Sequence, residues 1–130
     1  MKYHRITFCL IIFLLLLPAV NAQRKMERLD RGIVAIPKSS SQIYISWRHF
    51  ATDPDDIAYN LYYKTTEAGT LIKLNINPIT NSTNYTASLN TSSATYTFVI
   101  KSIINGVEKD EPGSFTLPQN TVASRIVHDF

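Results

Sequence analysis

Three aspartates close together, Asp53, Asp55 and Asp56, are the first residues whose type and spacing could do chemistry. Hard cations such as Ca²⁺ take several oxygen ligands, and carboxylates are common among them. A helix–loop–helix calcium loop needs further ligands and a spaced glutamate, which this segment lacks. Because Pro54 follows Asp53, a turn whose aspartates accept bonds from nearby amides is the simpler interpretation. Asp53, Asp55 and Asp56 are therefore weak metal candidates, and the sequence predicts no other metal ligand.

Aromatic side chains offer a second kind of chemistry, because an exposed ring can stack on the apolar face of a sugar. Tyr44, Trp47, Phe50, Tyr62 and Tyr63 lie in two predicted strands and the loop between them. Strand alternation directs Trp47 and Tyr63 inward and leaves Tyr44 and Tyr62 on the opposite faces. Aromatic residues in strands more often pack in the core or across strands. Tyr44 and Tyr62 are therefore weak carbohydrate-binding candidates.

Residues that commonly serve in catalysis are few. Beyond residue 22 the histidines are His49 and His128, and there is no cysteine. The sequence has no G-x-S-x-G, no H-E-x-x-H and no glycine-rich phosphate loop. His49 lies beside a predicted turn, where a solvated or edge histidine is the expected role, and His128 lies in the C-terminal tail. The sequence therefore predicts no catalytic residue and no cofactor for this chain.

The charge balance excludes a polybasic binder. The chain has 13 Lys+Arg and 10 Asp+Glu, which gives a net charge of +3, and its longest basic cluster is Arg24-Lys25. Nucleic-acid-binding domains usually carry a basic patch or stripe. We therefore expect no nucleic-acid partner.

The first 22 residues follow the plan of a secretory signal peptide. Lys2 and Arg5 precede an apolar run over 6–17, and small residues lead to a cleavage site after Ala22. That run is shorter than the roughly 20 apolar residues that span a bilayer. We expect a secreted, periplasmic or cell-surface protein with no stable membrane span after cleavage. An uncleaved membrane anchor is the alternative.

The rest of the chain has the period-2 pattern of β-strands. After a lead-in over 23–30, apolar residues alternate in short runs separated by turn residues. The predicted strands are 32–37 (ended by Pro37), 42–47, 57–64, 71–74, 83–89, 94–104 and 107–117. Asn105-Gly106 predicts a tight hairpin turn, and Pro112-Gly113 a bulge or bend.

About seven short strands without a helix favour an all-β sandwich over 31–118, with a closed barrel as the alternative. Trp47 and Tyr96 resemble the core tryptophan and the strand-F tyrosine of fibronectin type III-like or immunoglobulin-like domains. The predicted core is Ile43, Ile45, Trp47, Tyr59, Leu61, Tyr96, Phe98 and Ile100.

Three blocks, in order along the chain, resemble one known family. They are residues 26–36, the W-R…T-D-P-D-D-I-A-Y-N-L-Y run within 45–62, and a stretch within 74–85. They are similar to the start of mature rhamnogalacturonan lyases of polysaccharide lyase family 11. The long T-D-P-D-D run is unusual, which makes the resemblance specific.

The resemblance implies an amino-terminal β-sheet domain that precedes a β-propeller. In that family the propeller binds calcium and cleaves rhamnogalacturonan I, a pectin backbone, by β-elimination. The 13 residues after Leu117 cannot hold a propeller, so 119–130 is interpreted as a truncated linker toward an absent propeller. We expect a non-catalytic accessory domain, with a β-propeller or pectic polysaccharide as partner. A stand-alone carbohydrate-binding module and a small lyase are the alternatives.

The density of charge around the T-D-P-D-D run suggests a fixed loop. Arg48 lies five residues before Asp53, and an arginine can hold a carboxylate through two hydrogen bonds. We hypothesise that Arg48 braces this turn.

Overall fold

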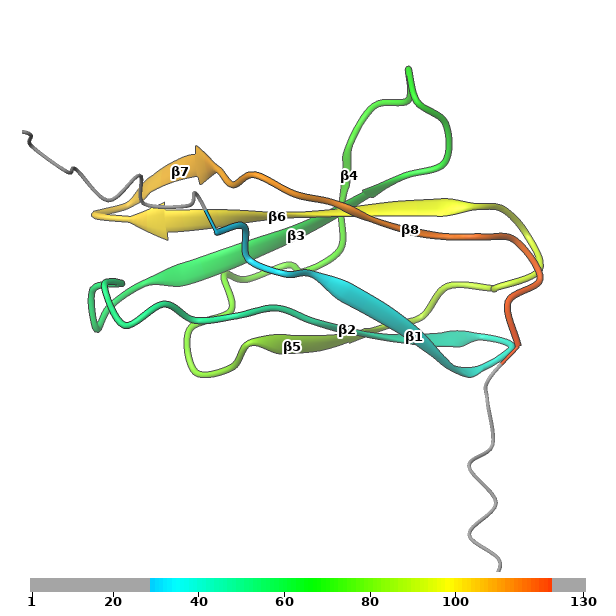
Figure 1. Cartoon of the computed structure of the whole chain (residues 1–130), viewed down its shortest axis with the longest axis horizontal. Helices are drawn as coiled ribbons and strands as arrows, with labels where there is room; N and C mark the ends of the chain where they lie inside the picture. Colours follow the sequence, from blue (N-terminus) through cyan, green and yellow to red (C-terminus); the bar gives the residue numbers. More distant parts are fainter. Residues whose placement is uncertain (1–28, 123–130) are drawn as a thin grey trace, which may run out of the picture.

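The computed structural model describes residues 29–122 and shows two packed antiparallel sheets (Figure 1). The predicted signal peptide and His128 lie outside these residues. The eight strands of the described chain are β1 (Val34–Ser39), β2 (Gln42–Ser46), β3 (Ala58–Lys64), β4 (Ile72–Lys73), β5 (Asn84–Ala87), β6 (Tyr96–Ile104), β7 (Val107–Asp110) and β8 (Phe115–Leu117). This part of the chain holds no helix long and apolar enough to cross a membrane.

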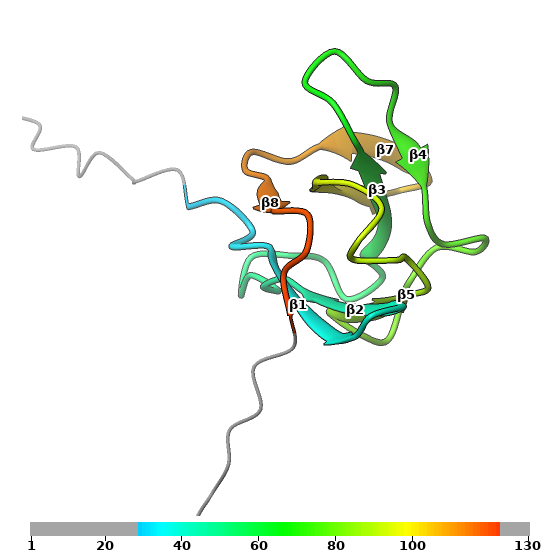
Figure 2. The same cartoon turned by 90° about the vertical axis from the view of Figure 1, so that its right-hand side faces the viewer.

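One layer has three strands and the other has five. The three-stranded sheet has the order β1-β2-β5, and the five-stranded sheet the order β4-β3-β6-β7, with β8 also pairing with β6. β7 pairs with 101–104 of β6 and β8 with 96–98, so the two strands follow each other along one edge. Figure 2 shows the layers end on, with β1 beside β8 at one side and β5 below β4 at the other. The prediction of an all-β sandwich is confirmed.

The core lies between the two sheets. All eight predicted core residues are buried, and Ile43, Ile45, Leu61, Phe98 and Ile100 are fully so. Seven of them alternate along β2, β3 and β6, and Trp47 continues the alternation directly after β2, as the period-2 pattern predicts. The Trp47 and Tyr59 rings meet edge to face at 5.4 Å between centroids, which joins the two layers.

Two local predictions proved wrong. β1 continues through Pro37, which pairs with Ile43, instead of ending there. A proline is tolerated in an edge strand because its nitrogen can face away from the neighbouring strand. The predicted final strand, 107–117, is two strands instead of one; the bend predicted at Pro112 and Gly113 (φ +96°) is confirmed, and it separates β7 from β8.

Two predicted features are confirmed. Asn105 and Gly106 have φ values of 52° and 74°, as the tight β6–β7 hairpin turn requires. The hydroxyl of Tyr96 donates to the carbonyl of Asn90 at 2.9 Å, the hydrogen bond that defines a tyrosine corner. Tyr96 thereby fixes the loop before β6 to the start of that strand.

Candidate functional site

The T-D-P-D-D turn is held by Arg31 instead of Arg48. The guanidinium of Arg31 donates to both carboxylate oxygens of Asp53, with Nη2 and Oδ1 2.9 Å apart. Arg48 is 56% exposed and lies 3.6 Å from Asp30. The hypothesis that Arg48 braces the turn is therefore wrong, although the turn has an arginine brace.

Strand alternation explains why Arg31, and not Arg48, contacts Asp53. The backbone nitrogen of Arg48 donates to the carbonyl of Arg31 at 2.7 Å, so the two residues are neighbours on adjacent chain segments. Arg31, Ile33 and Ala35 point inward in alternation. Trp47 also points inward, which directs Arg48, the next residue, toward solvent.

Arg31 is 3% exposed, and its charge is compensated on several sides. Nη2 also donates to Glu111 at 2.9 Å, and the guanidinium carbon lies 4.2 Å from the ring centroid of Phe50 and 5.5 Å from that of Tyr59. Burial alone would lower the pKa of Arg31, but its hydrogen bonds to Asp53 and Glu111 raise it above the ordinary value. Arg31 therefore stays charged and joins three segments at one end of the sandwich.

Asp53 accepts four hydrogen bonds from three groups. In addition to Arg31, the Phe50 amide donates to its Oδ2 at 2.8 Å and the Tyr59 hydroxyl at 3.3 Å. Burial acts to raise the pKa of Asp53, but these hydrogen bonds outweigh it and the pKa is lowered. Burial is also the main reason why the pKa of Tyr59 rises to about 12. Both groups keep one protonation state near neutral pH.

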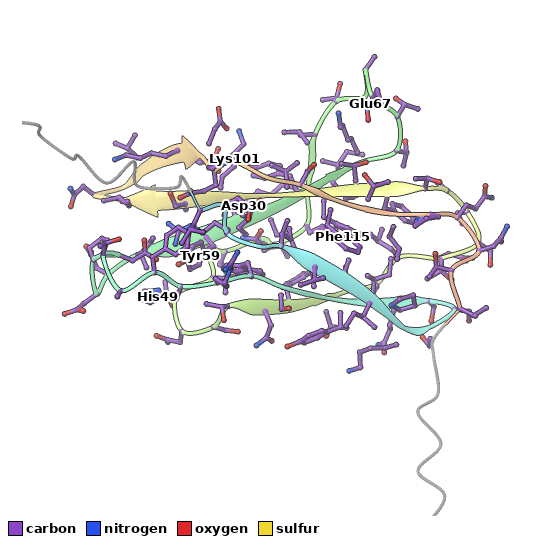
Figure 3. All side chains as sticks on the ribbon, in the orientation of Figure 1. Asp30, His49, Tyr59, Glu67, Lys101 and Phe115 are labelled. Carbon is purple, nitrogen blue, oxygen red and sulfur yellow. The ribbon has the colours of Figure 1, made fainter. Side chains whose placement is uncertain are left out.

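His49 lies at the rim of this cluster. Its side chain is 50% exposed, and Nδ1 lies 3.3 Å from the Tyr59 hydroxyl and 3.4 Å from Asp53 Oδ2. Figure 3 shows Tyr59 between the two layers and His49 close to it at the same end of the sandwich. His49 is thus the partly solvated histidine that the sequence suggested, with Asp53 as a neighbour.

The structure separates the three metal candidates. Asp53 is directed inward toward Arg31, whereas Asp55 and Asp56 are exposed. Within residues 29–122, no three His, Cys, Asp or Glu side chains are arranged to hold a metal ion. The structure therefore does not bring Asp53, Asp55 and Asp56 together as ligands.

The two sugar-binding candidates lie on different layers. Tyr44 is on the outer face of β2, next to Ile36 of β1 in the register, and Tyr62 is on the outer face of β3. A single platform cannot contain both rings. Of the other aromatic residues considered, Trp47 is buried, Phe50 lies against Arg31, and Tyr63 packs edge to face on Tyr96 at 5.6 Å.

Tyr62 belongs to a polar network on the outer face of the five-stranded sheet. Its hydroxyl donates to Glu108 Oε1 at 2.8 Å, and Lys101 Nζ lies 5.1 Å from its ring centroid. Lys101 also lies 3.0 Å from Asp110 and 3.6 Å from Glu108. Figure 3 shows Lys101 on the outer side of β6. An aromatic ring next to a cation and two carboxylates could contact both the apolar and the hydroxyl groups of a sugar.

A buried asparagine orients this network from below. Asn75, 4% exposed, accepts from the Leu61 amide at 2.7 Å and donates to Asn60 Oδ1 at 2.9 Å. Asn60 in turn donates to Glu108 at 2.7 Å. Sequence reasoning missed Asn75 because it lies in a loop between short strands, where asparagine is an ordinary turn residue.

Together, the tyrosine corner, the core tryptophan and the two-sheet topology define a fibronectin type III-like β-sandwich. Solved structures agree. A Fn3-like protein from Clostridium thermocellum has a TM-score of 0.54 and 23% identity, covering 72% of this chain and 93% of that one. A fibronectin type III domain derived from human KIAA0970 protein also has a TM-score of 0.54, with 12% identity and 72% of each chain covered.

Sequence comparison identifies the family. Residues 24–117 match the model of the rhamnogalacturonan I lyases beta-sheet domain. The chain is also 34% identical, over 91 residues, to the rhamnogalacturonan endolyase YesW of Bacillus subtilis (strain 168). The chain belongs to the family of rhamnogalacturonan I lyase β-sheet domains. The match covers 70% of this chain and 13% of that relative's length.

Proposed function

We propose that this chain is a non-catalytic accessory module of an exported system that degrades rhamnogalacturonan I. One observation carries the proposal: residues 24–117, which include all eight strands of the described sandwich, match the β-sheet domain of these lyases. The similarity to the endolyase is confined to 13% of that enzyme's length. The catalytic groups of a longer lyase would then lie in its other parts.

The environment of the buried ionisable groups supports this assignment. Abstraction of a proton next to a uronate carboxyl needs a base with a pKa matched to the working pH. Tyr59 has a pKa of about 12, and Arg31 and Asp53 are joined in a bidentate ion pair. These groups serve packing and are poorly placed to exchange protons with a substrate.

The proposal extends to location, partner and metal. The basic, apolar and small-residue segments of 1–22 support export with cleavage after Ala22. A β-propeller catalytic domain is the expected partner of the module, and calcium is expected in that propeller and not in the sandwich. The intact mass of the protein recovered from an exporting host tests the cleavage directly.

An assay with rhamnogalacturonan I tests the main proposal. β-Elimination leaves an unsaturated uronate, which is followed by its ultraviolet absorbance and by the size of the oligosaccharides released. We expect the purified protein to give the same trace as a heat-denatured sample. A sustained rise in absorbance that disappears on heating would contradict the proposal and support a small lyase.

Carbohydrate binding is the second candidate, and the network around Tyr62 favours it. A half-buried ring with Lys101, Glu108 and Asp110 around it offers stacking and hydrogen bonding at one place. Calorimetric titration with pectic oligosaccharides tests this function. Binding that Tyr62→Ala abolishes and Tyr44→Ala retains would support a module that binds through the five-stranded sheet; equal binding by all three proteins would contradict that site.

A further inference from the structure

The edges of the two sheets differ in how they are protected. β1 and β5 are the edges of the three-stranded sheet, and β4 and the β7–β8 pair are those of the five-stranded sheet. An unprotected edge strand offers free N–H and C=O groups to a strand of another molecule. Proteins usually block such edges with proline, charge, bulges or very short strands.

Three of these edges carry such a feature. β1 contains Pro37, changes register between Pro37 and Ser39, and runs beside β8. β4 has two residues, of which one is Lys73. β7 presents the charged run 108–110, Glu-Lys-Asp.

β5 has no proline, no charge and no bulge. Its sequence is Asn-Tyr-Thr-Ala, with no proline and no charge, and no register shift occurs in its pairing with β2. It also lies within the longest uncharged part of the chain, because no Asp, Glu, Lys, Arg or His occurs between Lys73 and Lys101. A strand approaching this edge meets no repulsive charge from the residues around it in the sequence.

The hydrogen bonds show which groups of β5 face outward. The amide of Trp47 donates to the carbonyl of Thr83, so Thr83, Tyr85 and Ala87 direct their backbone groups toward β2. Asn84 and Thr86 therefore direct theirs to the open side. The Ser82 hydroxyl contacts both the amide and the carbonyl of Asn84 at 3.1 Å. The open position of the described edge is Thr86.

We propose that β5 pairs antiparallel with β5 of a second copy, about a two-fold axis at Thr86, to form one continuous six-stranded sheet. A two-fold interface must be self-complementary, and here it is. Thr86 would exchange hydrogen bonds with its own counterpart, and Asn84 would lie opposite Ser88. Threonine–threonine cross-strand pairs are favourable, and no like charges meet.

The overall charge also favours a second copy of this chain as the partner of β5. Residues 29–122 contain seven Lys+Arg and eight Asp+Glu, so two copies repel each other little. The shared edge is only four residues long. An interface of this kind falls below roughly 1,200 Å² of buried surface, the range of weak and transient complexes. The expected dimer is therefore dependent on protein concentration.

Sedimentation velocity over a concentration series tests the proposal on the purified protein. We expect the wild-type sedimentation coefficient to rise with concentration toward that of a dimer. Thr86→Lys, which places like charges opposite each other, and Thr86→Pro, which removes the outward N–H, should stay monomeric. Val107→Lys adds the same charge to an exposed residue of β7 and should associate like the wild type.

A second readout separates loss of pairing from loss of folding. Exchange of the Thr86 amide hydrogen should slow as wild-type concentration rises, and circular dichroism should show that Thr86→Lys retains the wild-type spectrum. A wild-type protein that is monomeric at every concentration would overturn the proposal. So would a folded Thr86→Lys variant that associates as strongly as the wild type.

Discussion

Arg31 and Asp53, 22 residues apart in the sequence, form a bidentate ion pair whose side chains are only 3% and 6% exposed. The pair joins the segment that enters β1 to the turn that precedes β3. Glu111, which lies in the bend between β7 and β8, accepts a hydrogen bond from the same guanidinium. The Arg31 side chain thus connects segments of both layers at this end of the sandwich.

Replacing Arg31 should therefore be costly. Removal of one partner of a buried ion pair leaves the other charge uncompensated and typically costs about 3–5 kcal/mol. We expect Arg31→Ala to lower the free energy of unfolding by that amount in urea titrations. Arg48→Ala, which removes an exposed pair with Asp30, should cost about 0–1 kcal/mol. A larger loss for Arg48→Ala than for Arg31→Ala would contradict the assignment of the brace.

The sequence indicated that the T-D-P-D-D turn needs an arginine, but proximity along the chain pointed to Arg48. Alternation was the better guide, since the pattern that directs Trp47 inward also directs Arg48 outward. The strand pattern predicted the two-sheet fold and the core because burial has a strict period of two in a sandwich. The pairing of Arg31 with Asp53 and Glu111 could not be predicted in this way, because it depends on which loops meet at one end.

Trp47 should dominate the stability of the core. Its side chain is 4% exposed and packs on Tyr59, so Trp47→Ala leaves a large cavity and should cost about 3–5 kcal/mol. Within the described residues its indole nitrogen has no hydrogen-bond partner. Trp47→Phe should therefore retain more of the stability than Trp47→Ala, as measured by chemical denaturation. Equal losses for the two variants would show that ring packing is not the main contribution.

Asn75 should contribute more to the stability of the protein than its place in a loop suggests. Its side-chain oxygen accepts the Leu61 amide at 2.7 Å, next to the bond from the Leu74 amide to the Leu61 carbonyl, and so extends the ladder beyond β4. A buried amide without a partner costs about 1–3 kcal/mol. We expect Asn75→Ala to lower the free energy of unfolding by about 1–3 kcal/mol or more. Asn77→Ala removes an exposed side chain nearby and serves as the control, for which the melting temperature should stay unchanged.

Because the three aspartates are separated, we expect divalent cations to have no effect on the stability of the protein. Asp53 already accepts two hydrogen bonds from Arg31, and Asp55 and Asp56 are exposed. Calcium or EDTA should leave the melting temperature of the purified protein unchanged. Binding that stabilises the folded state would raise the melting temperature with cation concentration. A rise that Asp55→Asn removes would contradict this prediction and restore the turn as a metal site.

Acid should destabilise the protein through Asp53. Burial acts to raise the pKa of this carboxyl, but the hydrogen bonds from Arg31, Phe50 and Tyr59 lower it below its ordinary value of about 3.9. The unfolded state then binds more protons as the pH falls, so the stabilisation is fully present above about pH 4–5 and decreases below that range. Urea titrations between neutral pH and pH 2.5 should show this decline.

Asp53→Asn provides the test of that cause. The variant loses the ion pair and should be less stable at neutral pH, yet it should lose less further stability below pH 4 than the wild type. Asp55→Asn, which changes an exposed carboxyl two residues away, should keep the wild-type pH dependence. If Asp53→Asn and the wild type decline equally, acid sensitivity comes from another group. Glu108, whose pKa is lowered first by the hydrogen bond from Asn60, would be the next to examine, because its loss of charge would weaken the hydrogen bond from Tyr62 and the ion pair with Lys101.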